Sequence, residues 1–173
     1  MVLTDDNFAS IEAAVEEGRG VFDNLTKIIT WTLPTNLGEG LIILLAIIAG
    51  VTLPILPIHI LWINMTTVGV LGIVLAMERR EPGIMRRPPR DPQRPILTRE
   101  LLLRILLVGA VILVGAFGLF ERQLRLQASI AEARTLVVNV VVFVEIFYLF
   151  NCRSLSQSPF RIGLWTNPWV IGG

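Results

Sequence analysis

Apolar residues along the chain gather in four long stretches, separated by polar or proline-rich segments. The stretches run approximately over residues 28–48, 58–77, 101–120 and 135–150 of the 173-residue sequence. A helix needs about 20 apolar residues to cross a hydrocarbon core of roughly 30 Å, and each stretch is close to that length. The pattern predicts an all-α fold, a polytopic membrane helical bundle with about four transmembrane helices.

The chain before the first span is too polar to enter a bilayer. Asp5 and Asp6 are suited to cap a helix, and apolar residues follow at helical spacing as far as Val15. Gly18 and Gly20 interrupt this pattern before it resumes and leads into the first span. We therefore expect a short N-terminal cytosolic stalk of two helices, the second of which continues into the membrane. The acidic first residues do not resemble a secretory signal peptide.

Proline and arginine mark the connections between the spans. GVTLPILP, with Pro54 and Pro57, predicts a short turn after the first span. The connection after the second span is proline-rich and holds seven arginines: Arg79, Arg80, Arg86, Arg87, Arg90, Arg94 and Arg99. Arginines after the third span are fewer and are diluted by glutamates. Because cytoplasmic loops carry an excess of Lys and Arg, we expect the arginine-rich loop and the stalk in the cytoplasm.

Composition supports the membrane interpretation and excludes several other classes. Hydrophobic residues make up 53% of the chain, charged residues only 17%, and the mean hydropathy is +0.67, whereas a soluble domain carries about 25% charged residues. A net charge of +1 gives no reason to expect a nucleic-acid partner. The arginine run alone could suggest one, but its prolines and its position between two spans argue against that alternative. The single cysteine, Cys152, excludes an internal disulfide and a cysteine-rich metal site.

Several polar residues fall inside the apolar stretches, where they are costly. Asn36 and Glu39 lie three residues apart in the first span, Asn64 and Thr67 three apart in the second, and Glu145 lies in the fourth. A charged side chain at the bilayer centre costs about 3 kcal/mol on insertion scales. A protonated Glu39 bonded between helices is the alternative explanation for that residue. Asn and Thr also commonly join membrane helices by hydrogen bonds alone.

Two carboxylates and several neutral oxygens on separate helices can form a cage for a cation. A hard cation such as calcium takes six to eight oxygen ligands from carboxylates, amides, hydroxyls and backbone carbonyls. Pro34 would leave one such carbonyl free in the first span. The sequence shows no cluster of sulfur or imidazole ligands, which disfavours zinc and copper. The lone His59 is interpreted as an interfacial hydrogen-bonding residue.

Four motifs in sequence order resemble the type II, calcium-pump-like P-type ATPases. They are LPTNLGEG, LPIHILWINMTT, EPGIMRRPPRDP and ARTLVVNVVVFVEIF. They follow a segment, MVLTDDNFASIEAAVEEGRGVFDNLTK, that is similar to the end of the family's phosphorylation domain and its stalk. The resemblance covers almost the whole chain. It implies that the chain is the C-terminal membrane portion of such a pump.

The resemblance also implies a set of cation ligands. Calcium pumps of this family hold their ions with an Asn and a Glu in the fifth span, an Asn, a Thr and an Asp in the sixth, and a Glu in the eighth. The matching positions here are Asn36, Glu39, Asn64, Thr67 and Glu145. The aspartate of the family falls at Val68, which removes one carboxylate. Two carboxylates neutralise one divalent cation, so a site for two calcium ions is not expected.

Several parts of a complete pump do not occur in this sequence. It holds no D-K-T-G phosphorylation motif, no nucleotide-binding domain and no T-G-D-G-x-N-D hinge. The fourth span of the family, which supplies further ion ligands, is also missing. We therefore expect no catalytic residues here, no ATP hydrolysis by the chain alone, and ATP and magnesium only in the missing domains. The expected bound species is a transported metal cation, calcium or another.

The resemblance leaves three functions open. The first is the cation-binding and translocation segment of an ATP-driven pump, joined covalently or as a split subunit to the missing N-terminal part. The second is a stand-alone, pump-derived membrane protein that binds or regulates a partner, and the third is a non-functional gene remnant. In each case we expect a multi-pass protein in the lipid bilayer of the plasma membrane, with no nucleic-acid partner.

These features divide the chain into five expected regions. They are residues 1–27, the end of the phosphorylation domain and the stalk; 28–77, a helical hairpin of two spans with the ion-site residues; 78–100, the cytosolic Arg/Pro-rich loop; 101–150, two further spans; and 151–173, a cytosolic loop and the start of a truncated span.

Overall fold

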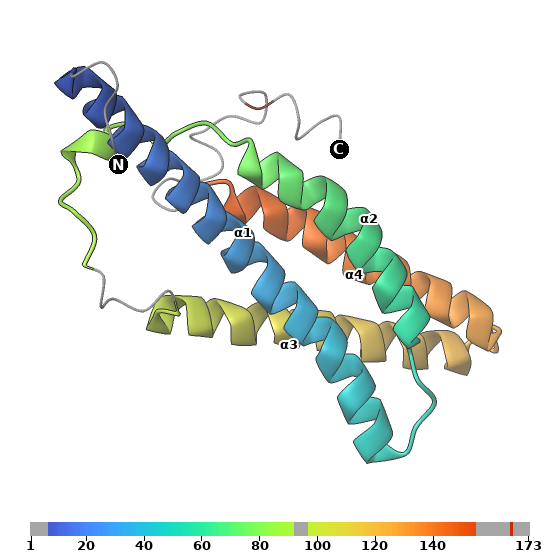
Figure 1. Ribbon diagram of the computed structural model, residues 1–173. Helices are drawn as coiled ribbons and strands as arrows, with labels where there is room; N and C mark the ends of the chain where they lie inside the picture. The colour runs from blue at the N-terminus through green and yellow to red at the C-terminus, as the bar shows by residue number, and fades with distance from the viewer. Residues whose placement is uncertain (1–6, 92–96, 155–166, 168–173) are drawn as a thin grey trace.

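The computed structural model describes residues 7–91, 97–154 and 167, and within them every regular element is a helix. The elements are α1 (Phe8–Ala49), α2 (Pro57–Ala76), the 3-10 turn η1 (Ile84–Arg86), α3 (Arg99–Arg125) and α4 (Ile130–Cys152) (Figure 1). Four of these helices are long and apolar enough to cross a membrane. The predicted all-α membrane bundle is therefore confirmed. Most of the tail, 151–173, lies outside the described residues.

The stalk and the first span form one continuous helix, so the predicted break at Gly18 and Gly20 is wrong. The helix α1 runs for 42 residues from an N-cap at Asn7, whose side chain accepts a hydrogen bond from the Ala9 amide. Glycine lowers helix stability by about 1 kcal/mol relative to alanine but keeps its backbone hydrogen bonds. Gly20 is also buried, with the Arg80 side chain packed over it. Flanking helical residues and this contact are enough to continue the helix.

In Figure 1, α1 crosses α3, runs alongside α2, and extends beyond the other membrane helices at its N-terminal end. It contacts α2, α3 and α4. The helices α1 and α3 approach closely at Gly38, where a Cβ atom would lie 2.9 Å from Ile112 Cδ1. Any larger residue at this position would force Ile112 or one of the two helices to shift. This crossing fixes the neighbourhood of Glu39, the next residue in α1.

The ends of the helices follow local sequence signals. Gly50 ends α1 with a φ of +64°, a left-handed conformation that favours glycine. Pro57 occupies the first turn of α2, where a missing N–H costs nothing. Ser129 and Glu132 form a capping box at the start of α4. The turns predicted from proline and glycine therefore orient the helices that carry the polar residues.

Candidate cation site

Three helices bring the predicted carboxylates into one buried interior. Glu39 of α1 is 1% exposed, and Glu145 of α4 is 0% exposed. Thr67 of α2 is buried beside them, and Asn64, one turn earlier, is partly buried. Asn64 contacts Glu39, and Glu145 has Thr67 and Glu39 as its polar neighbours, so these four residues lie together between α1, α2 and α4.

Asn64 links the first two helices at the site. Its Nδ2 donates to Oε2 of Glu39 over 2.8 Å and to the backbone oxygen of Ile60 over 3.1 Å. The amide oxygen of the same side chain is then turned to accept a donor or bind a cation. The Asn–Glu hydrogen bond fixes one carboxylate oxygen and leaves the other, Oε1, buried without a hydrogen-bond donor in the described structure.

Glu145 has the fewest hydrogen-bond partners for its carboxylate in this group of residues. Both of its carboxylate oxygens are buried, and neither accepts a hydrogen bond from the described residues. Its polar neighbours are Thr67 and Glu39. The Thr67 hydroxyl, however, donates to the backbone oxygen of Ile63 over 2.8 Å. A buried ionised carboxylate without a donor is strongly unfavourable, so these oxygens require a proton or a cation.

Two positions singled out in the sequence stand apart from this group. Asn36 is exposed on α1, although Glu39, three residues later, is buried. Positions three apart on a helix point about 60° apart, so one can face the interior while the other lies at its edge. Val68, at the position of the family's aspartate, is half-buried and packs against the hydrophobic core.

Residues that the sequence did not indicate hold α1 against α4 beside the site. Trp31 Nε1 donates to the backbone oxygen of Glu145, and the Tyr148 hydroxyl donates to the backbone oxygen of Thr30, both over 3.0 Å. Pro34, four residues after Thr30, was the one sequence signal for the Tyr148–Thr30 bond, because proline leaves the Thr30 oxygen without its helical donor. No sequence pattern pointed to the aromatic donors.

The described residues hold no group of three or more His, Cys, Asp and Glu side chains that could together bind a metal. The site therefore depends on two carboxylates together with neutral oxygens. This donor set suits a hard cation such as calcium, magnesium or an alkali ion.

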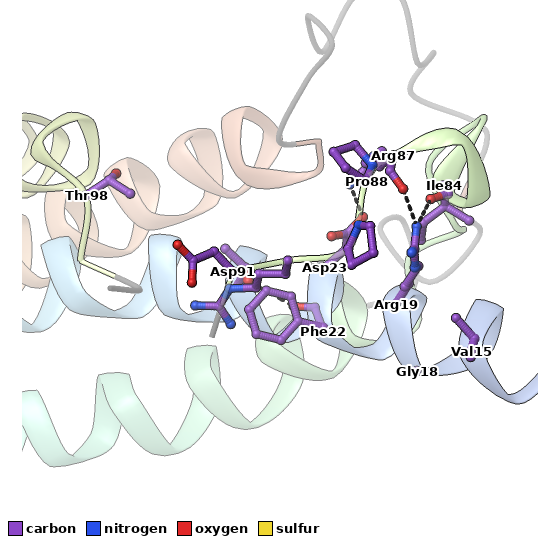
Figure 2. Close-up of a pocket in the computed structure, with 13 residues that line it drawn as sticks. Val15, Gly18, Arg19, Phe22, Asp23, Ile84, Arg87, Pro88, Asp91 and Thr98 are labelled. Carbon is purple, nitrogen blue, oxygen red and sulfur yellow. Dashed lines mark hydrogen bonds and ion pairs between the residues drawn. The ribbon is translucent and has the colours of Figure 1, made fainter. Parts of the chain in front are cut away.

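At the end of the bundle where α2 finishes, the arginine-rich loop folds back onto the N-terminal part of α1. Arg19 of α1 donates to the backbone oxygens of Ile84 and Arg87, over 2.9 and 2.7 Å, and Figure 2 shows its guanidinium pointing at both. Arg87 in turn pairs with Asp23 over 2.8 Å. The Arg90 guanidinium lies 4.3 Å from the centre of the Phe22 ring. Together the loop and the stalk line an open pocket of about 820 Å³.

A group of buried charges joins the middle of α1 to the segment just after α2 and to the end of α4. Arg153 pairs with Glu78 over 3.0 Å, and Lys27 lies 3.9 Å from Glu81. The side chains of all four residues are almost fully buried. Because removing one partner would strand the other charge, this group fixes how these three segments meet.

Comparison with known proteins gives relatives along the full chain. A probable cation-transporting ATPase F of Mycobacterium tuberculosis is 62% identical over 173 residues, which is 100% of this chain and 19% of the relative. A cation-transporting ATPase pma1 of Synechocystis is 45% identical over 91% of this chain and 18% of its own length. A calcium-transporting ATPase of Bacillus subtilis is 33% identical over 99% of the chain and 19% of the relative.

The chain thus spans about a fifth of the length of the curated relatives it matches. The family model described as "Cation transporting ATPase, C-terminus" matches residues 52–173. Four membrane-length helices, carboxylates buried between them and these matches point to the same family. The chain belongs to the cation-transporting ATPases, and it is the C-terminal membrane portion of a P-type pump.

Proposed function

We propose that this chain binds the transported cation within a P-type ATPase and passes it across the membrane. ATP hydrolysis would take place in domains to which this portion is joined. The observation that carries the proposal is the pair of buried carboxylates, Glu39 and Glu145, on two different helices. Three of their four oxygens have no hydrogen-bond donor among the described residues. Such a pair suits a site that alternately holds a cation and protons.

The proposed ligands are Glu39, Asn64, Thr67 and Glu145. The Asn64 side chain already contacts Glu39, so a cation would replace or share that hydrogen bond. The Thr67 hydroxyl can keep donating to Ile63 while its lone pair faces a cation. These residues supply fewer oxygens than the six to eight that calcium takes, so further ligands or water must complete the shell.

Asn36 is proposed as a ligand at the edge of the site. Its exposure on α1 leaves it on a face that the other described helices do not cover. The resemblance to calcium pumps implies that a further span supplies ligands and lies outside this chain. A cation bound between that span and α1 would bring Asn36 into the coordination shell.

The ion is proposed to be a hard cation, and the membrane to be the plasma membrane. One relative in Bacillus subtilis is named a calcium-transporting ATPase, whereas that in Mycobacterium tuberculosis is named only for cations. With Val68 in place of an acid, two carboxylates balance a single divalent charge. We therefore propose one divalent ion per pump, or monovalent ions instead.

A chimeric pump tests this function. The matching segment of the Mycobacterium tuberculosis relative is replaced by this chain, and ATP-dependent cation uptake into membrane vesicles is measured. Glu39→Gln and Glu145→Gln should each abolish uptake or weaken cation affinity by at least about tenfold, because each removes a buried negative charge. Glu121→Gln, an identical change at an exposed residue of α3, serves as the matched control. Unaltered uptake in both site variants would contradict the proposal.

A further inference from the structure

Two hydrogen bonds running in opposite directions join α1 to α4 beside the carboxylates. The Tyr148 hydroxyl of α4 donates to the backbone oxygen of Thr30 in α1, over 3.0 Å. Trp31 Nε1 of α1 donates to the backbone oxygen of Glu145 in α4, also over 3.0 Å. All four residues are buried. The two bonds therefore connect one turn of each helix at membrane depth.

Pro34 explains why the oxygen of Thr30 is available. Proline has no backbone N–H, so the carbonyl four residues earlier, that of Thr30, lacks its normal helical partner. The proline ring also displaces that carbonyl outward from the helix axis. Within a bilayer no water can replace the missing donor, so another protein group must do so. In this structure that group is the Tyr148 hydroxyl.

The same contact fixes the turn of α4 that carries Glu145. Tyr148 follows Glu145 by three residues, so the two side chains lie on neighbouring positions of one helix face. The backbone oxygen of Glu145 itself accepts the indole hydrogen bond of Trp31. Rotation or sliding of α4 along α1 would change the geometry of both bonds. The position of Glu145 relative to α1, and hence to Glu39, is thereby set.

We propose that Tyr148 is a positioning residue of the cation site, acting through the carbonyl that Pro34 frees. Trp31 supports it from the opposite direction. The free carbonyl, which the sequence offered as a possible ion ligand, is instead used to align two helices. The role in cation affinity rests on the proposed function, whereas the alignment of α1 and α4 does not.

The dependence on Pro34 gives a sharp test. In Pro34→Ala the amide at position 34 can donate to Thr30, so the Tyr148 hydroxyl is no longer needed there. We compare wild type, Tyr148→Phe, Pro34→Ala and the double variant, each as the full chain in detergent micelles. Thr135→Val is the matched control, because its hydroxyl donates to the Ala131 oxygen within α4 and removes no contact between helices.

Two measurements are made on each variant. The first is the position of the Trp31 indole N–H signal in ¹H–¹⁵N spectra, assigned with Trp31→Phe; it reports the bond to Glu145 whether or not a cation binds. The second is the affinity for calcium, and for sodium if calcium does not bind. Loss of fold stability alone lowers the melting temperature without moving the indole signal of the folded chain.

Tyr148→Phe should move the Trp31 indole signal and weaken cation affinity about tenfold, the typical effect of losing one buried hydrogen bond. In the Pro34→Ala background the same change should alter affinity less than about twofold and leave the indole signal in place. Thr135→Val should change neither measurement. The proposal is overturned if Tyr148→Phe leaves the indole signal unmoved, or has an equal effect in both backgrounds.

The outcomes separate this inference from the proposed function. If the wild-type chain binds neither cation, and the chimeric pump transports none, the proposed function fails. The Trp31 indole signal alone then tests whether Tyr148 aligns α1 with α4. If cations bind but Tyr148→Phe leaves their affinity unchanged, Tyr148 is no positioning residue of the site, and the proposed function stands.

Discussion

At the scale of single residues, the notable feature is that the two buried carboxylates, Glu39 and Glu145, have very few hydrogen-bond donors. Asn64 donates to the carboxylate of Glu39, and no described residue donates to the carboxylate of Glu145. An acid at position 68 would lie on α2, one residue after the buried Thr67. Instead Val68 packs against the core and contributes no charge. The number of charges that the site can hold is therefore decided by single positions.

Introducing an acid at that position should raise the number of divalent ions bound. In the chimeric pump, Val68→Asp is expected to bind two calcium ions where the unmodified protein binds at most one. The reason is that a buried positive charge without a counter-charge is strongly disfavoured. Equilibrium binding of radioactive calcium per phosphorylation site measures the stoichiometry. Val68→Asn, which adds oxygen without charge, is the control and should leave the stoichiometry unchanged.

Two calcium ions bound by the unmodified protein would contradict the argument from charge. So would an unchanged stoichiometry and ion preference in Val68→Asp, provided that the variant still inserts and is phosphorylated.

At the scale of helices, two features lead to predictions. They are the close approach of α1 to α3 at Gly38 and the capping box at the start of α4. Gly38 lets α1 approach α3 so closely that an added Cβ would lie 2.9 to 3.1 Å from three atoms of Ile112. Gly40, two residues later, has no heavy atom near its would-be Cβ. The sequence shows two similar glycines beside Glu39, and only the packing distinguishes them.

Gly38→Ala should destabilise the bundle by about 1–3 kcal/mol, the usual cost of overpacking a close contact. Gly40→Ala, its matched control, should leave stability unchanged or raise it slightly, since alanine favours a helix over glycine by about 1 kcal/mol. Thermal unfolding in detergent measures both. Ile112→Val removes the nearest atom and should recover part of the loss in Gly38→Ala. Equal effects of the two glycine substitutions would show that the crossing is looser than described.

The capping box of α4 predicts a dependence on pH. Hydrogen bonds from the backbone N–H and hydroxyl of Ser129, each 2.9 Å, hold the pKa of the exposed Glu132 below its ordinary value of 4.5. A lowered carboxyl pKa stabilises the fold above the ordinary pKa, and the stabilisation is lost as pH falls through the folded pKa. Ser129→Ala should raise the pKa of Glu132 toward 4.5. The fold should then lose less stability when the pH is lowered through this range.

A carboxyl ¹³C titration of Glu132 measures that shift directly, and thermal unfolding at several pH values measures its effect on stability. Ser129→Thr keeps both donors and should keep the low pKa. A Glu132 pKa that is the same in wild type and Ser129→Ala would mean that the hydroxyl does not act on this carboxylate.

At the scale of the whole molecule, polar contacts join the arginine-rich loop, the N-terminal part of α1 and the ends of α2 and α4. The loop is fixed to α1 through Arg19 and Arg87, and buried ion pairs at Glu78 and Glu81 join three helices. Asn24 adds hydrogen bonds to the backbone oxygens of Ala76 and Glu78, over 3.0 and 2.9 Å. These contacts connect the stalk to α2 and α4, the helices that carry Asn64 and Glu145.

The orientation of the molecule in the membrane is a further prediction at this scale. In a Cys152→Ser background, which removes the single native cysteine, Leu126→Cys should react with a membrane-impermeant maleimide on intact cells. Met85→Cys should react only after the cells are permeabilised, because its loop carries the excess of arginine. Both side chains are exposed, so access to the reagent depends on the side of the membrane. The reverse labelling pattern would invert the topology.

The sequence by itself determined the membrane spans, their turns and the residue types at the site. Apolar runs of this length have no stable place except a bilayer, and carboxylates within them require partners. Pro54, Pro57 and Gly50 act through their own backbone preferences, so their turns needed no knowledge of distant contacts. The family resemblance came from the same short motifs and agrees with the family match over residues 52–173.

Only the tertiary structure decided the continuity of α1, the separation of Asn36 from Glu39 and the fate of the carbonyl freed by Pro34. Gly20 lies within the unbroken α1, and Arg80, far along the chain, packs over it. Thr30 finds its donor in Tyr148, 118 residues later. Propensity and spacing describe neighbours within a few residues. They cannot state which distant side chain arrives at a given oxygen, because helix packing fixes that.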